Sequence, residues 1–328
     1  MKYKALLVRE LDNGKFSREI EDLNISDLPN NNVLIKVYYS SLNYKDALSA
    51  RIHKGITRKY PHTPGIDAAG IVVEDKSNTF KEGDEVIVTG YDLGMNTFGG
   101  FGQYISVPED WVVRLPKNLS LKESMYYGTA GFTSAICLNE LLKNSIEIGK
   151  TVLVTGATGG VGLTSVGMLN KVGYKVIAST GKIESIEMLK EIGAKEVISR
   201  EEVIDLTLRP LLSAKWDSAI DTVGGNTLSS VIRATSMHGI VCVLGNVSGD
   251  NLDVSIYPFL LRGVSLIGID SASKGMNLRI KLWDKIANDW KIDNLEKFIK
   301  EIKLEQLNDE IELILQGKQK GRVIINLQ

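Results

Sequence analysis

The sequence predicts an α/β protein in which a doubly wound parallel sheet forms one domain and a β-rich fold forms the other. Short strand-like segments separated by turns fill the first third, and a regular alternation of helix and strand follows from about residue 121. The length of 328 residues exceeds the usual limit of one hydrophobic core, so two domains are expected. We assign residues 1–120 to the first part of the β-rich domain, 121–262 to the parallel-sheet domain and 263–328 to a return to the β-rich domain.

The first third has the two-residue period of strands with one buried face. Val33, Ile35 and Val37 recur at every second position in this way. A segment at 94–102 carries four glycines and is predicted to be a loop that covers a neighbouring element. The strands expected here are 3–9, 32–39, 68–74, 85–90, 103–107 and 111–115.

The middle of the chain alternates between apolar strand-like runs and amphipathic helical segments, which is typical of a parallel sheet covered on both faces. The expected helices are 123–142, 161–172, 184–192 and 227–237. The expected strands are 151–155, 175–178, 196–199, 216–221 and 240–244. After about residue 253 the alternation fades, and the chain continues with strand 264–269, helices 277–290 and 304–315, and strand 321–327.

Composition excludes several classes of function. The 39 basic residues nearly balance the 40 acidic ones, so no charge excess indicates a nucleic-acid partner. No apolar run is long enough to span a bilayer, and residues 1–10 lack the apolar core of a signal peptide, so we expect a cytoplasmic protein. Cys137 and Cys242 stand far apart without a CxxC motif, which fits a reducing compartment and two buried thiols.

A glycine-rich turn at 156–162 (Gly-Ala-Thr-Gly-Gly-Val-Gly) joins the predicted strand 151–155 to the predicted helix 161–172. Glycines permit a tight turn and let backbone N–H groups at a helix start approach a pyrophosphate. A glycine pattern alone is weak support, because turns are often glycine-rich. Here the strand, turn, helix and next strand come in the order that dinucleotide binding requires.

The end of the next strand predicts preference for NADPH. A domain specific for NAD usually has an acidic residue there to hold the ribose 2′-hydroxyl, but this chain has Ser179-Thr180-Gly181-Lys182. Glu184, the nearest acid, falls at a predicted helix start, where it suits the helix dipole. Lysine and hydroxyls suit a 2′-phosphate. Arg200 follows the next predicted strand and is a candidate second cation for that phosphate; the alternative is an ordinary surface arginine.

Several strings together resemble the medium-chain dehydrogenase/reductase superfamily, and the likeness covers essentially the whole chain. They are Ser40 to Leu48 (SSLNYKDAL), Pro64 to Gly70 (PGIDAAG), Gly128 to Thr133 (GTAGFT) and the turn at 156–162. More narrowly, residues 42–46 (LNYKD), 220–224 (IDTVG) and 268–271 (GIDS) are similar to the zinc-free quinone-oxidoreductase-like branch of acrylyl-CoA reductase type. The resemblance implies a Rossmann domain and a GroES-like catalytic domain.

The zinc ligands of the superfamily's alcohol dehydrogenases are missing. Those enzymes carry a cysteine near the segment of Asn43 and a Gly-His-Glu where this chain has Gly65-Ile66-Asp67. No four-cysteine lobe is present either, so we expect no metal. Without a Lewis acid, a double bond conjugated to a carbonyl is a more suitable hydride acceptor than a simple ketone, provided that the enolate is stabilised by hydrogen bonds.

Tyr44, Asn43 and Asp67 are the candidate catalytic residues. By resemblance Tyr44 contacts the cofactor, and its phenol is a candidate proton donor; the alternatives are a solvent proton and a buried tyrosine that only satisfies a carbonyl. Asn43 and Asp67 occupy positions of zinc ligands in the relatives. Asp67 is equally well explained by a structural salt bridge to Lys45 or Arg51.

The resemblance also implies further cofactor contacts and a quaternary structure. Strand 264–269 often pairs across a two-fold axis in this superfamily, so a homodimer is expected. Lys182 stands where close relatives often have arginine, which is expected to soften the preference for NADPH. The implied cofactor contacts are Tyr44, Thr158, Gly159, Gly160, Val161, Thr180, Gly181, Lys182, Arg200, Asn246, Leu260, Ser271 and Arg322.

Three functions remain open at this stage. The first is reduction of acryloyl-CoA to propanoyl-CoA, with CoA phosphates on a cationic segment containing Lys45, Arg51, Lys54, Arg58 and Lys59, although such a cluster is often only a solvated face. The second is reduction of quinones, enones or enals in an apolar cleft lined by Tyr91, Phe98, Phe101 and Trp111. The third is a non-catalytic NADPH sensor or RNA-binding protein, against which the balanced charge argues.

Overall fold

The computed structural model describes residues 1–12, 15–207 and 209–328, which divide into two compact units. Unit 1 consists of Met1–Thr129, Ser271–Ala287 and Glu296–Gln328. Unit 2 consists of Ala130–Asp270 and Asn288–Leu295. The main part of the inserted unit is therefore bounded at 129/130 and 270/271, whereas the sequence pattern placed the changes at 120/121 and 262/263.

Unit 1 is built on a seven-stranded sheet with the order β14-β15-β3-β4-β5-β7, in which β6 also pairs with β3. Neighbouring strands are antiparallel except β14 and β15, which are parallel. Val33, Ile35 and Val37 of β3 are buried in its core, as their alternation predicted. The strands are β3 (Val33–Ser41), β4 (Asp67–Asp75), β5 (Glu85–Thr89), β6 (Tyr104–Val107), β7 (Val112–Arg114), β14 (Ile299–Lys303) and β15 (Arg322–Asn326).

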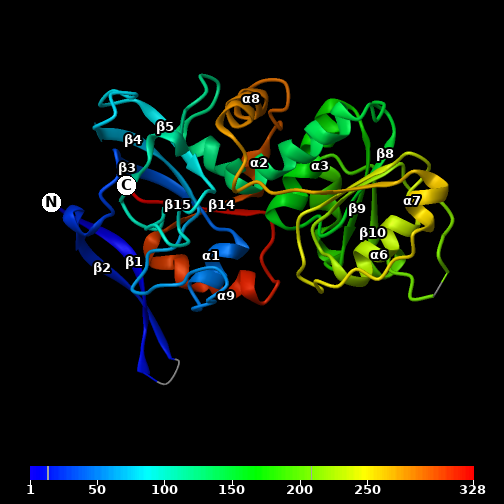
Figure 1. The fold of residues 1–328 in the computed structure, drawn as a ribbon, viewed down its shortest axis with the longest axis horizontal. Coiled ribbons are helices and arrows are strands. Elements are labelled where there is room, and N and C mark those ends of the chain that lie inside the picture. Colours follow the sequence, from blue (N-terminus) through cyan, green and yellow to red (C-terminus); the bar gives the residue numbers. More distant parts are fainter. Residues whose placement is uncertain (13–14, 208) are drawn as a thin grey trace. The chain divides into compact units, whose positions relative to one another are not determined.

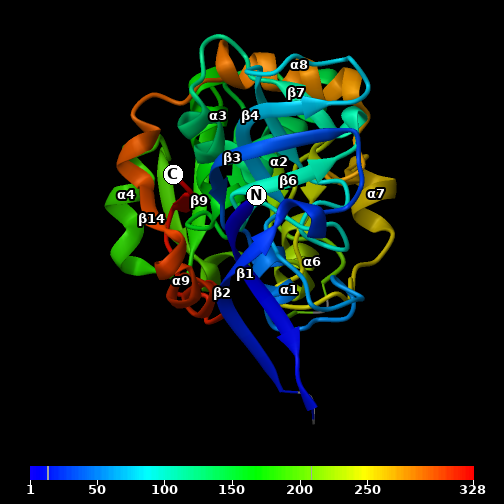
Figure 2. The same ribbon diagram turned by 90° about the vertical axis from the view of Figure 1, so that its left-hand side faces the viewer.

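A separate two-stranded ribbon of unit 1 pairs β1 (Lys2–Glu10) with β2 (Phe16–Asn24), and Figures 1 and 2 show these strands side by side. The helices assigned wholly to unit 1 are α1 (Tyr44–Ser49), α8 (Met276–Ala287) and α9 (Leu307–Leu315). Helix α2 (Leu121–Lys143) begins in unit 1 and continues into unit 2. Five of the described strands and α-helices were not foreseen in the sequence: β2, β14, α1, α5 (Arg200–Val203) and α7 (Tyr257–Arg262).

Unit 2 contains a six-stranded, wholly parallel sheet with the order β10-β9-β8-β11-β12-β13. This order is the doubly wound arrangement 3-2-1-4-5-6. Successive strands are added on one side of β8 and then, from β11 on, on its other side, so the switch point of the strand order lies between β8 and β11. The strands are β8 (Thr151–Val154), β9 (Lys175–Thr180), β10 (Glu196–Ser199), β11 (Ser218–Asp221), β12 (Ile240–Val243) and β13 (Ser265–Gly268). The predicted fold class is confirmed.

Helices of unit 2 pack on this sheet, as Figure 1 shows for α3 and α6. Helix α3 (Gly160–Val172) contacts β8 and β9, and α6 (Gly225–Arg233) contacts β11 and β12. The shorter helices are α4 (Ile186–Glu191) and α5 (Arg200–Val203), beside β9 and β10. Among the described residues, every helix is too short or too polar to cross a bilayer.

Candidate functional site

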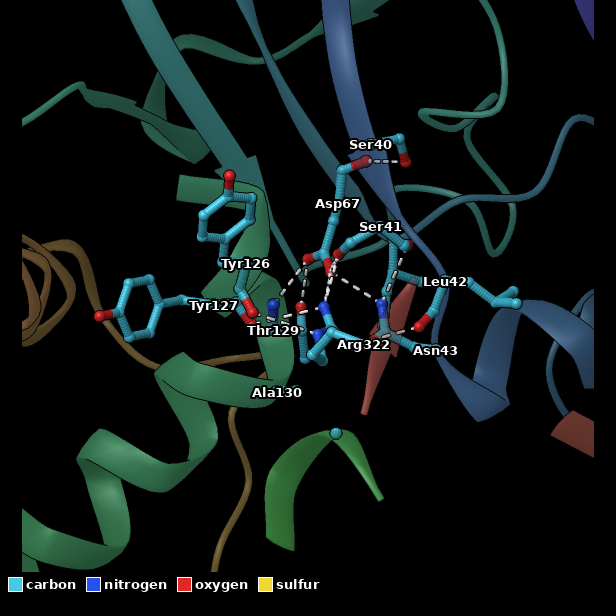
Figure 3. Close-up of polar contacts among 12 residues, drawn as sticks. Ser40, Ser41, Leu42, Asn43, Asp67, Tyr126, Tyr127, Thr129, Ala130 and Arg322 are labelled. Carbon is cyan, nitrogen blue, oxygen red and sulfur yellow. Dashed lines mark hydrogen bonds and ion pairs between the residues drawn. The ribbon is translucent and has the colours of Figure 1, made fainter. Parts of the chain in front are cut away.

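A buried polar network in unit 1 centres on Asp67, the first residue of β4 (Figure 3). Its Oδ1 accepts hydrogen bonds from the backbone N–H and the hydroxyl of Thr129, at 2.9 and 2.6 Å. Its Oδ2 accepts from Ser41 Oγ at 2.6 Å and Asn43 Nδ2 at 2.7 Å, and lies 3.8 Å from Nη2 of Arg322. The ion-pair partner of Asp67 is thus Arg322 rather than Lys45 or Arg51, the two partners considered from the sequence.

Arg322, the first residue of β15, is 2% exposed and directs its guanidinium into the same network. Burial lowers the pKa of Arg322, and the charges of Asp67 and Asp46 oppose that effect. The acceptors of its five hydrogen bonds, at 2.7–3.4 Å, are Ser41 Oγ, Asn43 Oδ1 and the main-chain carbonyls of Leu42, Tyr126 and Tyr127. This placement favours a positioning role for Arg322 over the predicted cofactor contact, which stays a prediction.

The network holds a kink in α2 at Gly128. This glycine has φ 50° and ψ −150°, a backbone conformation that L side chains rarely adopt. A Cβ at Gly128 would lie 2.5 Å from both Asp67 Oδ2 and Ser41 Oγ. The kink therefore depends on a residue without a side chain, and it brings the N–H of Thr129 to the Asp67 carboxylate while Figure 3 shows the neighbouring carbonyls facing Arg322.

Asp46 is a second buried carboxyl, linked to Asp67 through Asn43. It caps α1 by accepting the N–H of Asn43 at 2.8 Å, and its other oxygen accepts the N–H of Ile66 at 2.8 Å. The Nδ2 of Asn43 donates to Asp67 at 2.7 Å and to Asp46 at 3.3 Å. Burial and the nearby charge of Asp67 raise the pKa of Asp46 to about 7, against the opposing effect of its hydrogen bonds.

Tyr44 begins α1 directly after this network. Its side chain is 41% exposed, and its hydroxyl makes no hydrogen bond to any residue that the structure describes. The alternative of a buried tyrosine satisfying a carbonyl is therefore wrong. Asn43, by contrast, uses its amide within the network, because its Nδ2 donates to Asp67 and its Oδ1 accepts from Arg322.

The predicted nucleotide turn of unit 2 follows β8 at the point where the strand order reverses. Gly156 has φ 58°, and a Cβ there would lie 2.3 Å from Thr222 Oγ1. A Cβ at Gly162 would lie 2.3 Å from the carbonyl oxygen of Gly156, so the start of α3 folds back against the turn. At Gly159 the nearest atom to an added Cβ is 3.4 Å away. The N-terminus of α3 thus presents backbone N–H groups beside open space.

The residues predicted to select the cofactor come together at the ends of β9 and β10. A Cβ at Gly181 would lie 2.2–2.6 Å from three atoms of the Arg200 guanidinium, so Arg200 lies against the Gly181 turn. The N–H of Lys182 donates to Thr180 Oγ1 at 3.0 Å, which closes the turn. Arg200 is exposed, and the turn that it contacts continues directly into Lys182; a phosphate site shared by these two residues stays a prediction.

The remaining predicted contacts lie in different surroundings. Asn246 is exposed in the loop after β12, and Leu260 is 68% exposed on α7. Thr158 is buried within the turn, and Val161 is half-buried at the start of α3. Ser271 belongs to unit 1, where its carbonyl accepts from Nη2 of Arg279 at 3.1 Å. All of these contacts stay predictions.

One predicted member of the apolar cleft is wrong, because Phe101 is 0% exposed in the hydrophobic core. Phe98 packs edge-on against His62, and Tyr91 stacks on Trp111; their place in a cleft stays a prediction. The glycine-rich segment 94–102 packs on the main chain of residues 63–65, in agreement with the expected loop over a neighbouring element. Its N–H groups at 99, 100 and 101 donate to the carbonyls of Thr63, Gly65 and Pro64 at 2.7–3.0 Å, so it is a support beneath Asp67.

The cationic segment 45–59 is only partly available for a ligand. Arg51 lies 3.9 Å from a carboxylate oxygen of Glu312, and Lys54 is paired with Glu10. Within residues 1–12, 15–207 and 209–328, no ion pair is found for Lys45, Arg58 or Lys59. In the same ranges no group of three or more His, Cys, Asp or Glu side chains is arranged to hold a metal ion.

Comparison with known proteins defines the class of this fold and site. Residues 29–117 match the alcohol dehydrogenase GroES-like domain, and residues 160–288 match the zinc-binding dehydrogenase family. The chain is 48% identical over 95% of its length and 95% of the relative's to YhfP of Bacillus subtilis, which carries the provisional name of a quinone oxidoreductase. It is 38% identical to acrylyl-CoA reductase AcuI of Ruegeria pomeroyi, over 99% of both chains.

Solved structures agree with this likeness. The structure of YhfP with NAD bound has a TM-score of 0.97 at 46% identity and covers 100% of both chains. The YhdH oxidoreductase of Salmonella enterica in complex with NADP has a TM-score of 0.96 at 36% identity, over 99% of this chain and 100% of that one. The chain is an oxidoreductase of the medium-chain dehydrogenase/reductase superfamily. Within the superfamily it belongs to the quinone-oxidoreductase-like branch that contains YhfP and AcuI.

Sequence reasoning missed three members of the unit 1 network, Ser41, Asp46 and Thr129. Ser41 and Asp46 stand in the string SSLNYKDAL and Thr129 in the string GTAGFT, and both strings were already singled out. The available signal was Asn-x-x-Asp at 43–46, the spacing of a helix N-cap with an acidic residue three positions later. It predicts α1, but it does not reveal that the capping carboxyl is buried beside a second one.

Proposed function

We propose that this oxidoreductase uses NADPH to reduce a carbon–carbon double bond conjugated to a carbonyl, with acryloyl-CoA as the preferred substrate. The observation that carries the choice of cofactor is the placement of Arg200 against Gly181, beside Lys182, with no acidic residue at the end of β9. Two cations at this strand end suit a 2′-phosphate, and an acid would suit a 2′-hydroxyl. The NADP bound to YhdH supports this choice.

The turn at 156–162 fits the pyrophosphate of such a cofactor. Its glycines allow the close approach of backbone described above, and the first N–H groups of α3 point out of the helix without partners inside it. Thr158, Gly159, Gly160 and Val161 would hold the pyrophosphate. When bound, NADPH supplies hydride to the β carbon of the conjugated double bond.

Tyr44 is the residue of unit 1 best suited to assist the reaction. Its exposed phenol makes no hydrogen bond within the described ranges, so it can donate one to a carbonyl or give a proton. Asn43 and Asp67 are held in the network, and their proposed part is to fix the start of α1, where Tyr44 stands. Zinc independence stays a prediction from the missing ligands.

A CoA ester is favoured over a quinone by the likeness to AcuI along nearly the whole chain and by three cations, Lys45, Arg58 and Lys59, that hold no ion pair within the described ranges. The provisional name of YhfP favours the quinone. NADPH consumption with acryloyl-CoA, free acrylate and a benzoquinone, with NADH as the control cofactor, separates the two. Turnover confined to acryloyl-CoA supports the proposal, and faster reduction of the quinone with the ester inactive contradicts it.

We also propose a homodimer formed along β13, the edge strand of the unit 2 sheet. Exposed apolar side chains precede this edge on α7 and its approach: Val247, Leu252, Ile256, Tyr257, Leu260 and Leu261. An unpaired strand edge with apolar neighbours is a suitable surface for a second copy. Leu261→Asp is expected to give monomers in sedimentation analysis, whereas Ile148→Asp, at another exposed position of unit 2, should leave the dimer intact. Wild-type monomers would contradict the proposal.

A further inference from the structure

Two buried arginines of unit 1 stand next to two of the four places where the chain passes between the units. At these two connections the chain leaves unit 1 between Thr129 and Ala130 and returns between Asp270 and Ser271; the other two crossings are at 287/288 and 295/296. The main chain on the unit 1 side of both connections accepts hydrogen bonds from an arginine that is at most 2% exposed. These residues are Arg322 at the first connection and Arg279, in α8, at the second.

At the first connection Arg322 donates to the carbonyls of Tyr126 and Tyr127, at 3.3 and 3.4 Å. Asp67, its ion-pair partner, accepts hydrogen bonds from the N–H and the hydroxyl of Thr129. Thr129 is the last residue of unit 1 before the chain enters unit 2. The carbonyls and the N–H on either side of the Gly128 kink are thereby fixed to one charged pair (Figure 3).

At the second connection Arg279 donates from Nη2 to the carbonyls of Ser271 and Ala272, at 3.1 and 3.2 Å. Its Nη1 donates to the carbonyl and the hydroxyl of Thr89, both at 2.8 Å, which ties the returning chain to the end of β5. The guanidinium lies 4.5 Å from the ring centre of Tyr91, whose N–H donates to the carbonyl of Ala272 at 2.9 Å. The first two residues after the crossing are thus held from two directions.

Burying a guanidinium is costly, and an apolar residue would often stabilise a core equally well. What the planar fork adds is geometry, because it bonds two main-chain segments in fixed directions. We propose that Arg279 and Arg322 are positioning residues that fix the unit 1 ends of the connections at 129/130 and 270/271, so that turnover proceeds from one defined arrangement of these ends. This role rests on the proposed reductase activity for its kinetic consequence, but its structural consequence can be measured independently.

The test compares Arg279→Lys and Arg322→Lys with Arg233→Lys. Arg233 is a matched control because it is also buried and donates to the carbonyls of Thr207 and Arg209, at 2.7 and 2.9 Å, but lies wholly within unit 2. Lysine keeps the charge and loses the fork. At a temperature where all variants are folded, we expect kcat to fall about tenfold in the two junction variants, with KM for NADPH within about twofold, because misplaced groups lower turnover more than binding.

Hydrogen exchange provides the second readout. Amides 126–131 should exchange faster in Arg322→Lys and amides 270–273 faster in Arg279→Lys, whereas Arg233→Lys should change neither segment. Equal losses of kcat in all three variants, or unchanged exchange at both connections, would overturn the proposal. If wild-type protein reduces none of the substrates, the proposed function fails, and the exchange comparison alone decides the positioning role.

A milder variant covers the case in which Arg322→Lys does not fold. Thr129→Val deletes the hydroxyl bond to Asp67, 2.6 Å long, and leaves the backbone N–H in place. It should speed exchange at 128–131 and lower kcat in the same direction, by a smaller factor. Unchanged exchange and kcat in this variant would count against the proposal at the first connection.

Discussion

Replacing Asp46 by asparagine should change how the stability of this protein depends on pH. The carboxyl is completely buried and accepts three hydrogen bonds, two from Asn43 and one from Ile66. Those bonds favour the charged form, but burial, followed by the charge of Asp67, outweighs them and raises the pKa to about 7. Near neutral pH the folded protein therefore holds a proton at Asp46 that the unfolded chain has released.

The size of the effect follows from the difference between the two pKa values. An unfolded aspartate titrates near pH 3.9, so the folded pKa is about 3 units higher, which corresponds to about 4 kcal/mol. The unfolding free energy should fall as pH rises from about 4 to about 7, and it should level off above that. Between pH 5 and pH 8 the expected loss is roughly 3 kcal/mol.

The amide introduced by Asp46→Asn cannot ionise, but it sets an N–H donor against one of the N–H groups that Asp46 accepts, at a cost of about 1–3 kcal/mol. Urea unfolding of both proteins from pH 5 to pH 8 measures the difference between their unfolding free energies. The contributions of other titrating groups are the same in both proteins and cancel in this difference. Wild type should be more stable than Asp46→Asn at pH 5, and this advantage should vanish or reverse by pH 8.

Asp75→Asn is the matched control. Asp75 also accepts backbone N–H groups, from Ser77, Thr79 and Phe80, but it stands near the surface. The little burial it has would raise its pKa, yet the hydrogen bonds prevail and lower it. Its stability difference from wild type should therefore be the same at pH 5 and pH 8. A constant difference for Asp46→Asn as well would show that Asp46 is charged throughout, which would refute the reasoning.

Three further predictions concern single side chains. Gly181→Ala places a Cβ 2.2 Å from Nη2 of Arg200, which must swing away, so kcat/KM should fall about tenfold for NADPH but little for NADH, and an equal loss for both would contradict the cofactor assignment. Tyr44→Phe should leave the melting temperature unchanged, because the exposed hydroxyl makes no hydrogen bond within the described ranges. It should lower kcat at least tenfold if the phenol donates a proton. Full turnover with unchanged NADPH affinity would exclude Tyr44 both as proton donor and as cofactor contact. Gly128→Ala combines a positive φ with a 2.5 Å approach to Asp67, so calorimetry should show a loss of about 2–4 kcal/mol, and a neutral result would mean that the kink does not need glycine.

The parts of the fold that the sequence predicted are those with local signals. Val33, Ile35 and Val37 indicated a half-buried strand without reference to any other segment. The turn at 156–162 was predictable because glycines, a preceding apolar strand and a following helix lie next to one another in the chain. The two-domain organisation was predictable from the length of 328 residues and from the change to a helix–strand alternation near residue 121.

The parts that were missed depend on contacts between distant residues. Strand β2 has no fully buried residue and a high content of charge, so its pairing with β1 leaves no apolar alternation to detect. Gly128 fits a helical pattern on both sides, and only the presence of Asp67 and Arg322 explains the kink. The raised pKa of Asp46 likewise has a cause in Asp67, which comes close to it through folding rather than through sequence.

The glycine-rich support beneath Asp67 limits how this enzyme can be re-engineered. Added Cβ atoms at Gly99 and Gly100 would lie 2.4 and 2.0 Å from the carbonyl oxygens of Gly65 and Asp67, so two stretches of main chain are in direct contact there. Such a surface offers no side chain to exchange and no room to add one. Mutant libraries that aim to broaden substrate range should therefore leave residues 99–100 untouched and vary the exposed positions 51, 53, 54, 58 and 59 instead, where surviving clones are expected to be far more frequent.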